Sequence, residues 1–202
     1  MKLELYFLGN ADKDSRITNI KRSLNNEGHE VSVVSFDWFT ENFKTINGSV
    51  NIYKLKKNIS ILFYIKFALI TIKHLIKTDA RILFSEDVYT LPFVSLIGRL
   101  RGKKVIYNSR EFYAFLGGLT QRKKLQMAIA EIERIFIKLV NLVLTTGKMD
   151  SEFLEKLYNL KNTCVIRNIP LKKQNDEIID LRKLLNIDKS ITLLLYQGVL
   201  LK

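Results

Sequence analysis

The feature that most constrains the fold is a repeated alternation between short apolar runs and longer segments with helical hydrophobic periodicity. Several short runs are continuously apolar, as expected of strands covered on both faces. This alternation is typical of successive β-α-β units. We therefore expect an α/β fold, a Rossmann-like three-layer sandwich with a mostly parallel sheet of about seven strands. Strands are predicted at residues 3–8, 31–36, 50–55, 81–85, 105–108, 142–146 and 163–166, and helices at 14–26, 59–77, 90–101, 122–139 and 149–158.

Composition narrows the class of protein. The chain has only 9 Gly and 2 Pro in 202 residues, which favours dense regular structure over a linker or collagen-like chain. The single cysteine, Cys164, rules out a disulfide framework, fits a reducing compartment and is expected in the core. No histidine has a partner at metal-ligand spacing, so no metal site is expected. No signal peptide or membrane span is predicted, and we expect a cytoplasmic protein, with peripheral attachment to the inner face of the cell membrane as an option.

The pattern changes after residue 166, where Asn168 and Pro170 interrupt regular structure. Residues 178–185 are compatible with a short helix, and 191–196 form a new apolar run followed by Gly198. We expect a first domain over 1–170, a linker with a short helix over 171–190, and the first strand of a truncated second domain over 191–202. The chain is then a fragment that stops just inside that second domain.

The net charge of +13 suggests an anionic partner, although compositional drift of an AT-rich genome is a competing explanation. Nucleic acid is not expected, because no helix-turn-helix, RRM or OB pattern occurs. In the helix expected at 59–77, helical spacing brings Lys66, Lys73, His74 and Lys77 into one stripe. This surface could contact anionic lipid, or the helix could be wedged between neighbours with its lysine tips in water.

Polar residues follow three of the predicted strands, where ligands bind in open parallel sheets. Gly9 and Asn10 end the first strand, and Arg16 lies just inside the next helix. A glycine turn before a helix N-terminus can hold an anion. A plain turn and a solvated arginine are the alternatives, and the G-x-G-x-x-G fingerprint of dinucleotide-binding proteins is absent.

Glu86, Asp87 and Tyr89 follow the fourth strand, and Arg110 and Glu111 follow the fifth. The two adjacent carboxylates are candidates for binding sugar hydroxyls or for capping the next helix. A guanidinium offers planar, bidentate recognition of phosphate or carboxylate, and a glutamate accepts from hydroxyls. Alternatively, the arginine and glutamate form an ion pair that holds their loop. The glycine-containing loop 114–120 is expected to be flexible enough to close over a ligand.

Taken in order, these segments resemble the N-terminal domain of GT-B-fold glycosyltransferases, of the type known as glycosyltransferase family 4 or group 1. The stretches that carry the resemblance are DSRI at 14–17 and EGHEV at 27–31, EDVYTLP at 86–92, RGKKVIYNSRE at 101–111, NLVLTT at 141–146, VIRNIP at 165–170 and YQG at 196–198. Together they span nearly the whole chain, although no single one of them is decisive.

The resemblance implies an acceptor-binding domain that faces a C-terminal domain of its own chain. The whole enzyme would be a retaining, metal-independent transferase without a cofactor, moving a sugar from a nucleotide-sugar to a glycan or lipid-linked acceptor during polysaccharide or lipopolysaccharide biosynthesis. The fragment alone is expected to be inactive. A non-catalytic anion- or membrane-binding module and a GT-B-fold sugar-nucleotide epimerase are the alternatives.

The resemblance also implies roles for individual residues. Arg110 stands where many relatives carry a histidine, so the role of that position is the least certain to transfer. The implied roles are catalysis for Glu111 and Arg110, acceptor binding for Glu86, Asp87 and Tyr89, contact with the donor phosphates for Gly9, Asn10, Arg16 and Gly198, and an interdomain hinge for Asn168.

Overall fold

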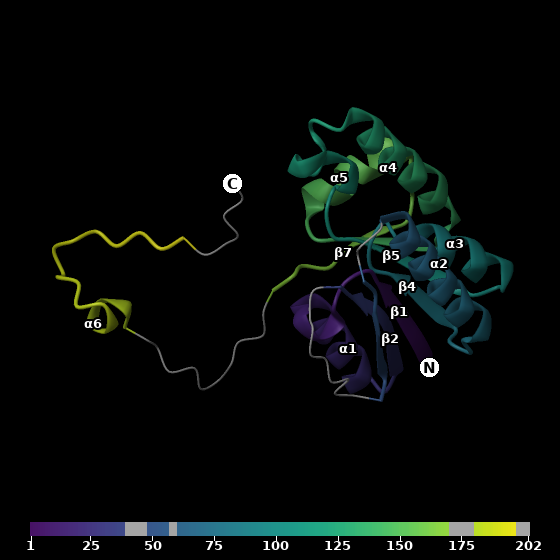
Figure 1. The fold of residues 1–202 in the computed structure, drawn as a ribbon, viewed down its shortest axis with the longest axis horizontal. Coiled ribbons are helices and arrows are strands. Elements are labelled where there is room, and N and C mark those ends of the chain that lie inside the picture. Colours follow the sequence, from purple (N-terminus) through teal and green to yellow (C-terminus); the bar gives the residue numbers. More distant parts are fainter. Residues whose placement is uncertain (39–47, 57–59, 170–179, 197–202) are drawn as a thin grey trace. The chain divides into compact units, whose positions relative to one another are not determined.

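The computed structural model describes residues 1–38, 48–56, 60–169 and 180–196. The seven strands predicted between residues 3 and 166 all form, and they join one sheet in the order β3-β2-β1-β4-β5-β6-β7 (Figure 1). Each of the six pairings is parallel, which confirms the predicted fold class. The strands are β1 (Lys2–Phe7), β2 (Glu30–Asp37), β3 (Val50–Lys54), β4 (Ile82–Ser85), β5 (Lys104–Ser109), β6 (Leu142–Thr145) and β7 (Thr163–Val165).

Helices cover both faces of this sheet, which explains why its strands are apolar on both sides. The α-helices are α1 (Ser15–Asn26), α2 (Ser60–Lys77), α3 (Leu91–Leu100), α4 (Lys123–Phe136), α5 (Lys148–Tyr158) and α6 (Leu181–Leu184). Short 3₁₀ turns occur at η1 (Ala11–Lys13), η2 (Tyr113–Phe115), η3 (Gly117–Leu119) and η4 (Ile137–Leu139).

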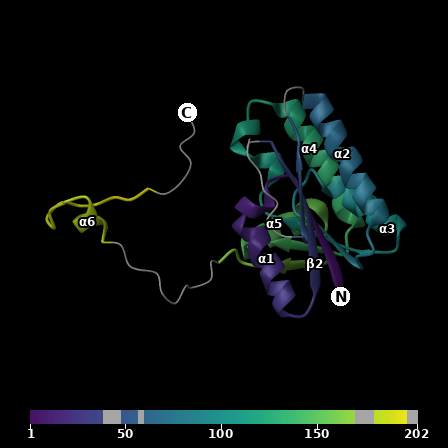
Figure 2. The same ribbon diagram turned by 60° about the horizontal axis from the view of Figure 1, so that its bottom comes forward.

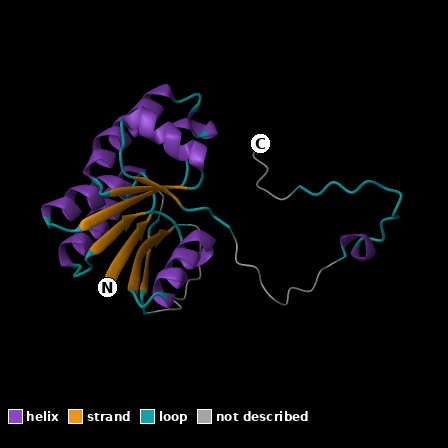
Figure 3. Cartoon of the chain, turned by 180° about the vertical axis from the view of Figure 1, so that it is seen from behind, coloured by secondary structure: helices purple, strands orange, loops and turns teal. Residues whose placement is uncertain are grey.

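The helices divide unevenly between the two faces. Phe63 and Phe67 of α2 and Val94 of α3 pack against one face, and Leu154 of α5 extends the same layer. Ile17 of α1 packs against the opposite face. Helices α2, α3 and α4 lie side by side (Figure 2), and the strands run between the two helical layers (Figure 3).

The strand order places a topological switch point at the centre of the sheet. From β1 the chain moves outward through β2 to β3, then crosses back to β4 on the other side of β1. Connections therefore diverge in opposite directions at the carboxyl ends of β1 and β4. Ligands of open parallel sheets bind in the crevice at such a point. The carboxyl ends of β1, β4 and β5 are adjacent here, so their loops form one continuous edge.

The chain divides into two compact units, Met1–Asn168 and Ile169–Lys202. The expected short helix forms as α6, over four residues. The strand predicted at 191–196 does not form, because these residues are mostly exposed and pair with no strand among the described residues. Gly198 and residues 170–179 lie outside the described residues. No helix in the described part has the length and apolar character needed to cross a bilayer.

Cys164 corrects a second expectation. Its apolar neighbours suggested a place in the core, but the residue is exposed. The reason is that β7 is the last strand of the sheet, so it has a neighbour on one side only. An apolar run therefore predicted a strand correctly here without predicting burial.

Candidate functional site

The carboxyl edge of the central strands carries a buried ion-pair cluster built on Arg110. Its Nη2 lies 3.1 Å from Glu86 Oε2 and its Nη1 lies 2.8 Å from Asp14 Oδ2. Asn108 Nδ2 donates to the same Glu86 oxygen at 2.8 Å. Glu86 is fully buried, and the Arg110 side chain is only 6% exposed. One guanidinium therefore joins the loops that follow β4 and β5 to the start of α1.

Burial and charge act against each other in this cluster. Burial raises the pKa of Glu86, and the nearby Arg110 charge and the Asn108 hydrogen bond offset part of that rise. Burial works to lower the pKa of Arg110, but the carboxylates of Glu86 and Asp14 outweigh it and leave that pKa raised. The arginine therefore stays charged. Glu86 Oε1 is also buried, and within the described part of the chain no group donates a hydrogen bond to it.

Asp87, the second carboxylate after β4, is used to hold backbone. Its Oδ2 accepts from the N–H of Leu8 at 2.6 Å, and its Oδ1 accepts from the N–H of Thr90 at 2.8 Å. Burial raises the pKa of Asp87. These contacts hold the β1 turn and the residue before α3, whereas α3 itself has no side-chain cap at Thr90, so the capping role weighed for Asp87 is not seen in its strict form. Its acceptor-binding role stays a prediction.

The turn after β1 is shaped by packing around the arginine. A Cβ on Gly9 would lie 2.4 Å from the Phe7 ring, so only glycine leaves that ring in place. The ring in turn lies under the Arg110 guanidinium, 4.6 Å from its centroid to Cζ. Asn10 accepts from the N–H of Asp12 and donates to Asp37 Oδ2, each at 3.0 Å. Gly9 therefore leaves room for the Phe7 ring, which contacts the Arg110 guanidinium.

The two arginines near the start of α1, Arg16 and Arg110, differ in whether their charge is free to bind an anion. Asp14 caps α1 by accepting from the N–H of Ile17 at 2.9 Å, so a phosphate at that helix start would have to displace a carboxylate. Arg16 is half-buried and, within the described ranges, has no ion-pair partner. Arg110, by contrast, is committed to Glu86 and Asp14. Of the two arginines, Arg16 is the one available to an anion.

The remaining predicted residues fall as follows. Glu111 is exposed at the end of β5, next to Arg110, and the ion pair weighed between them is replaced by the pairs with Glu86 and Asp14. Asn168 is the last residue of the first unit, a position compatible with a hinge. The predicted roles of these residues remain predictions.

Tyr89 lies beside an apolar pocket of about 190 Å³. Its ring is stacked near Tyr64, with centroids 6.4 Å apart, and meets Tyr113 edge-on at 6.1 Å. Other lining residues come from α2, α3 and α4, among them Phe93 and Ile132. Val88 and Tyr89, which line the pocket, belong to the same loop after β4 that carries Glu86. The edge therefore offers polar and apolar surface next to each other.

Sequence reasoning missed some members of this arrangement. Asp14 could have been expected as a helix cap, but its pairing with a residue 96 positions away leaves no local signal. Asp37 is the last residue of β2 and Asn108 the last but one of β5, and these positions near strand ends were the available signal. Among the described residues, no group of three or more His, Cys, Asp or Glu side chains is placed to hold a metal ion.

No family model matches the sequence, and no curated protein sequence matches it. Solved structures do match. Sucrose-phosphate synthase from Thermosynechococcus elongatus has a TM-score of 0.68 at 12% identity, with 94% of this chain and 53% of that chain covered. The chain has the fold of a GT-B glycosyltransferase domain.

Two further structures match this GT-B-type domain. The lipopolysaccharide outer core galactosyltransferase WaaB has a TM-score of 0.57 at 15% identity, with 86% of this chain and 47% of that chain covered. UDP-GlcNAc 2-epimerase from Methanocaldococcus jannaschii has a TM-score of 0.54 at 13% identity, with 82% and 45% covered. At these identities the likeness shows the fold alone. The chain spans about half the length of the structures it matches.

Proposed function

We propose that this chain is the acceptor-binding domain of a retaining, metal-independent glycosyltransferase that uses a nucleotide-sugar in polysaccharide or lipopolysaccharide biosynthesis. The observation that carries the proposal is the polar edge at the switch point of a GT-B-type sheet. There, Glu86, Arg110 and Asp14 form a rigid cluster beside an exposed glutamate, Glu111. In this proposal, a second Rossmann-like domain of the whole enzyme binds the nucleotide-sugar donor.

The cluster and the exposed residues have different tasks in this proposal. Arg110 and Glu86 are buried, so they position the loop that carries Glu111. Glu111 holds the acceptor hydroxyl that attacks the anomeric carbon. The bond from that carbon to the diphosphate breaks, the bond to the acceptor oxygen forms, and the hydroxyl proton leaves with the diphosphate. Arg16, with Gly9 and Asn10, faces the developing negative charge of the diphosphate.

The acceptor class follows from the surface next to the cluster. A sugar hydroxyl finds hydrogen-bond acceptors at the polar edge, while the pocket beside Tyr89 is lined by apolar side chains. An acceptor with both a sugar and a hydrocarbon part satisfies both surfaces, because burial of apolar groups in such a pocket is favourable. This combination favours a lipid-linked acceptor over a free sugar.

The proposal is tested on the full-length protein with a panel of nucleotide-sugars and of free and lipid-linked glycans. The expected result is acceptor-dependent release of nucleoside diphosphate, retention of the anomeric configuration in the product, and no effect of a metal chelator. Replacing Glu111 by Ala should lower turnover by about 10²-fold, because the acceptor hydroxyl then loses the contact that positions it for attack. Glu152→Ala, an exposed glutamate on α5, is the matched control.

Two outcomes would contradict the proposal. Conversion of a nucleotide-sugar to its epimer without any acceptor would instead indicate an epimerase. Unchanged turnover in Glu111→Ala, with the wild-type enzyme active, would remove that residue from the site.

A further inference from the structure

The outer face of α2 exposes large apolar side chains along its length. Ile61 is 72% exposed, Leu69 62%, and Ile76 59%, and Leu62 and Ile65 are each about half exposed. At 100° per residue these side chains project from one side of the helix, opposite the buried stripe of Phe63 and Phe67. Helix α2 is therefore apolar on both sides, although only one side meets the sheet. Such exposed apolar surface marks an interaction site.

The same face has a basic edge. Lys66, Lys73 and Lys77 are exposed and follow one another along one side of the apolar face at spacings of seven and four residues. Within the described ranges none of the three has an ion-pair partner. No acidic residue occurs between Asn42 and Thr78, so α2 carries no negative charge of its own. The face thus combines hydrocarbon with uncompensated positive charge.

We propose that the outer face of α2 docks this protein onto an anionic lipid bilayer, with α2 lying in the plane of the membrane surface. The apolar side chains enter the boundary between headgroups and acyl chains, and the lysines pair with lipid phosphates. The charges of Lys66 and Lys73 interrupt the apolar sequence of α2, so the helix is not expected to span the bilayer. As the wedged-helix alternative expects, α2 packs against the sheet and α3 and its three lysines are exposed, but α2 also leaves large apolar side chains exposed on its outer face.

Neighbouring elements support the bilayer as the occupant. Helix α3, which packs beside α2, adds Leu100 at 78% exposure and Leu96 at 46%. A protein partner would need acidic groups to match the lysines, and the chain as a whole has a net charge of +13.

The experiment is flotation of the full chain with large unilamellar vesicles, because it does not depend on any transferase activity. Binding is expected to vesicles that contain phosphatidylglycerol and to be weak for pure phosphatidylcholine. Replacing all three lysines by Gln should weaken binding by about 100-fold, since each lysine near an anionic surface contributes roughly fivefold. The double variant Ile65→Glu with Leu69→Glu should abolish binding even at low salt.

Matched controls come from α5 and the residue range after it. Met149→Glu changes a methionine that is 83% exposed, and the triple variant Lys148→Gln, Lys156→Gln and Lys161→Gln removes an equal charge from exposed positions. Both controls should bind like the wild type apart from a small general charge effect. Circular dichroism verifies that every variant is folded.

A second measurement places α2 in the membrane. In a Cys164→Ser background, which removes the single exposed thiol, a polarity-sensitive fluorophore on Leu69→Cys should shift to the blue with anionic vesicles, and one on Met149→Cys should not. The proposal is overturned by equal binding of both vesicle types, by equal loss in the α5 controls, or by equal fluorophore shifts. It is also overturned if Ile65→Glu with Leu69→Glu turns a lipid-free dimer into a monomer, since the face would then be a subunit interface.

Discussion

Arg110 holds the centre of the candidate site together through buried charges. Breaking a buried ion pair leaves an uncompensated charge and costs about 3–5 kcal/mol. We expect Arg110→Met to lower the free energy of unfolding by about that amount, because Glu86 is fully buried. The double variant with Glu86→Gln should recover part of the loss, since no buried charge is then left at that position. Urea unfolding of the two single variants and the double variant measures this coupling.

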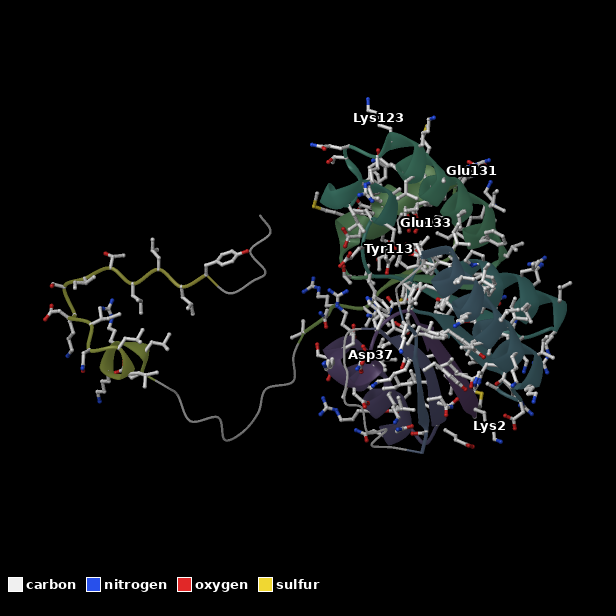
Figure 4. All side chains as sticks on the ribbon, viewed as in Figure 1. Lys2, Asp37, Tyr113, Lys123, Glu131 and Glu133 are labelled. Atoms are coloured by element: carbon white, nitrogen blue, oxygen red, sulfur yellow. The ribbon has the colours of Figure 1, made fainter. Side chains whose placement is uncertain are left out.

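The buried carboxyl group of Glu133 should make the free energy of unfolding depend on pH. It accepts from the hydroxyls of Tyr107 at 2.6 Å and Tyr158 at 2.8 Å, and Figure 4 shows it inside the domain, whereas Glu131 lies at the surface. Burial raises the pKa of Glu133. The folded state therefore keeps the Glu133 carboxyl protonated to higher pH than the unfolded state does. The stability that this bound proton contributes is lost as pH rises above about 4.5.

Glu133→Gln removes that titration while its amide keeps contact with both hydroxyls. We expect the stability of this variant relative to the wild type to increase as pH rises from about 4.5 to 8. Chemical unfolding at several pH values checks this. Glu131→Gln, on the exposed face of the same helix, is the control and should show no such increase. A flat difference for Glu133→Gln would contradict the assigned pKa direction.

The residues of the site were predicted more by position than by contact. Glu86, Asp87, Arg110 and Glu111 are candidates because strand ends in a parallel sheet share one edge. Their partners were not found, because the pairing of Arg110 with Asp14 joins residues 96 positions apart and depends on the strand order. An arginine after a strand suggests recognition of a ligand. Only the fold shows that the N–H donors of Arg110 are already bonded to Glu86 and Asp14.

The elements themselves were largely predictable. Several buried strands are continuous apolar runs, so their positions are visible, and each strand end lies within one residue of the expected one. The strand predicted at 191–196 fails because an apolar run needs a paired neighbour. Cys164 shows the same limit at the sheet edge, where strand character and burial separate. Pattern thus predicts local conformation, whereas the sheet order decides burial.

The close contact between α3 and the sheet at Gly98 should make stability sensitive to a larger side chain at that position. Gly98 faces β5, and a Cβ there would lie 2.6 Å from Val105 Cγ2 and 3.2 Å from Leu83 Cδ1. Gly98→Ala should push the helix from the sheet and cost roughly 1–3 kcal/mol. Gly117→Ala, where no atom of the described residues lies within 4 Å of the added Cβ, should change stability by less than about 0.5 kcal/mol. Urea midpoints at unchanged slope compare the two. Equal midpoints would show that α3 has room to move.

At the scale of the whole molecule, stability and membrane binding are both expected to reside in the first unit. The core clusters and the sheet lie within Met1–Asn168, and none of the described residues after Asn168 is buried. Removal of residues 169–202 should therefore move the thermal midpoint by less than about 2 °C, given about 2–4 °C per kcal/mol for a domain of this size. Calorimetry of the two chains measures this.

The same truncation distinguishes the occupants of the α2 face. If that face meets a bilayer, residues 1–168 should bind anionic vesicles as tightly as the full chain, because Lys66, Lys73, Lys77 and the exposed apolar side chains are all retained. If the second unit covers the face, truncation should instead strengthen vesicle binding and lower the thermal midpoint together, since apolar surface would be newly exposed. The two measurements on one pair of proteins therefore separate a membrane surface from an intramolecular interface.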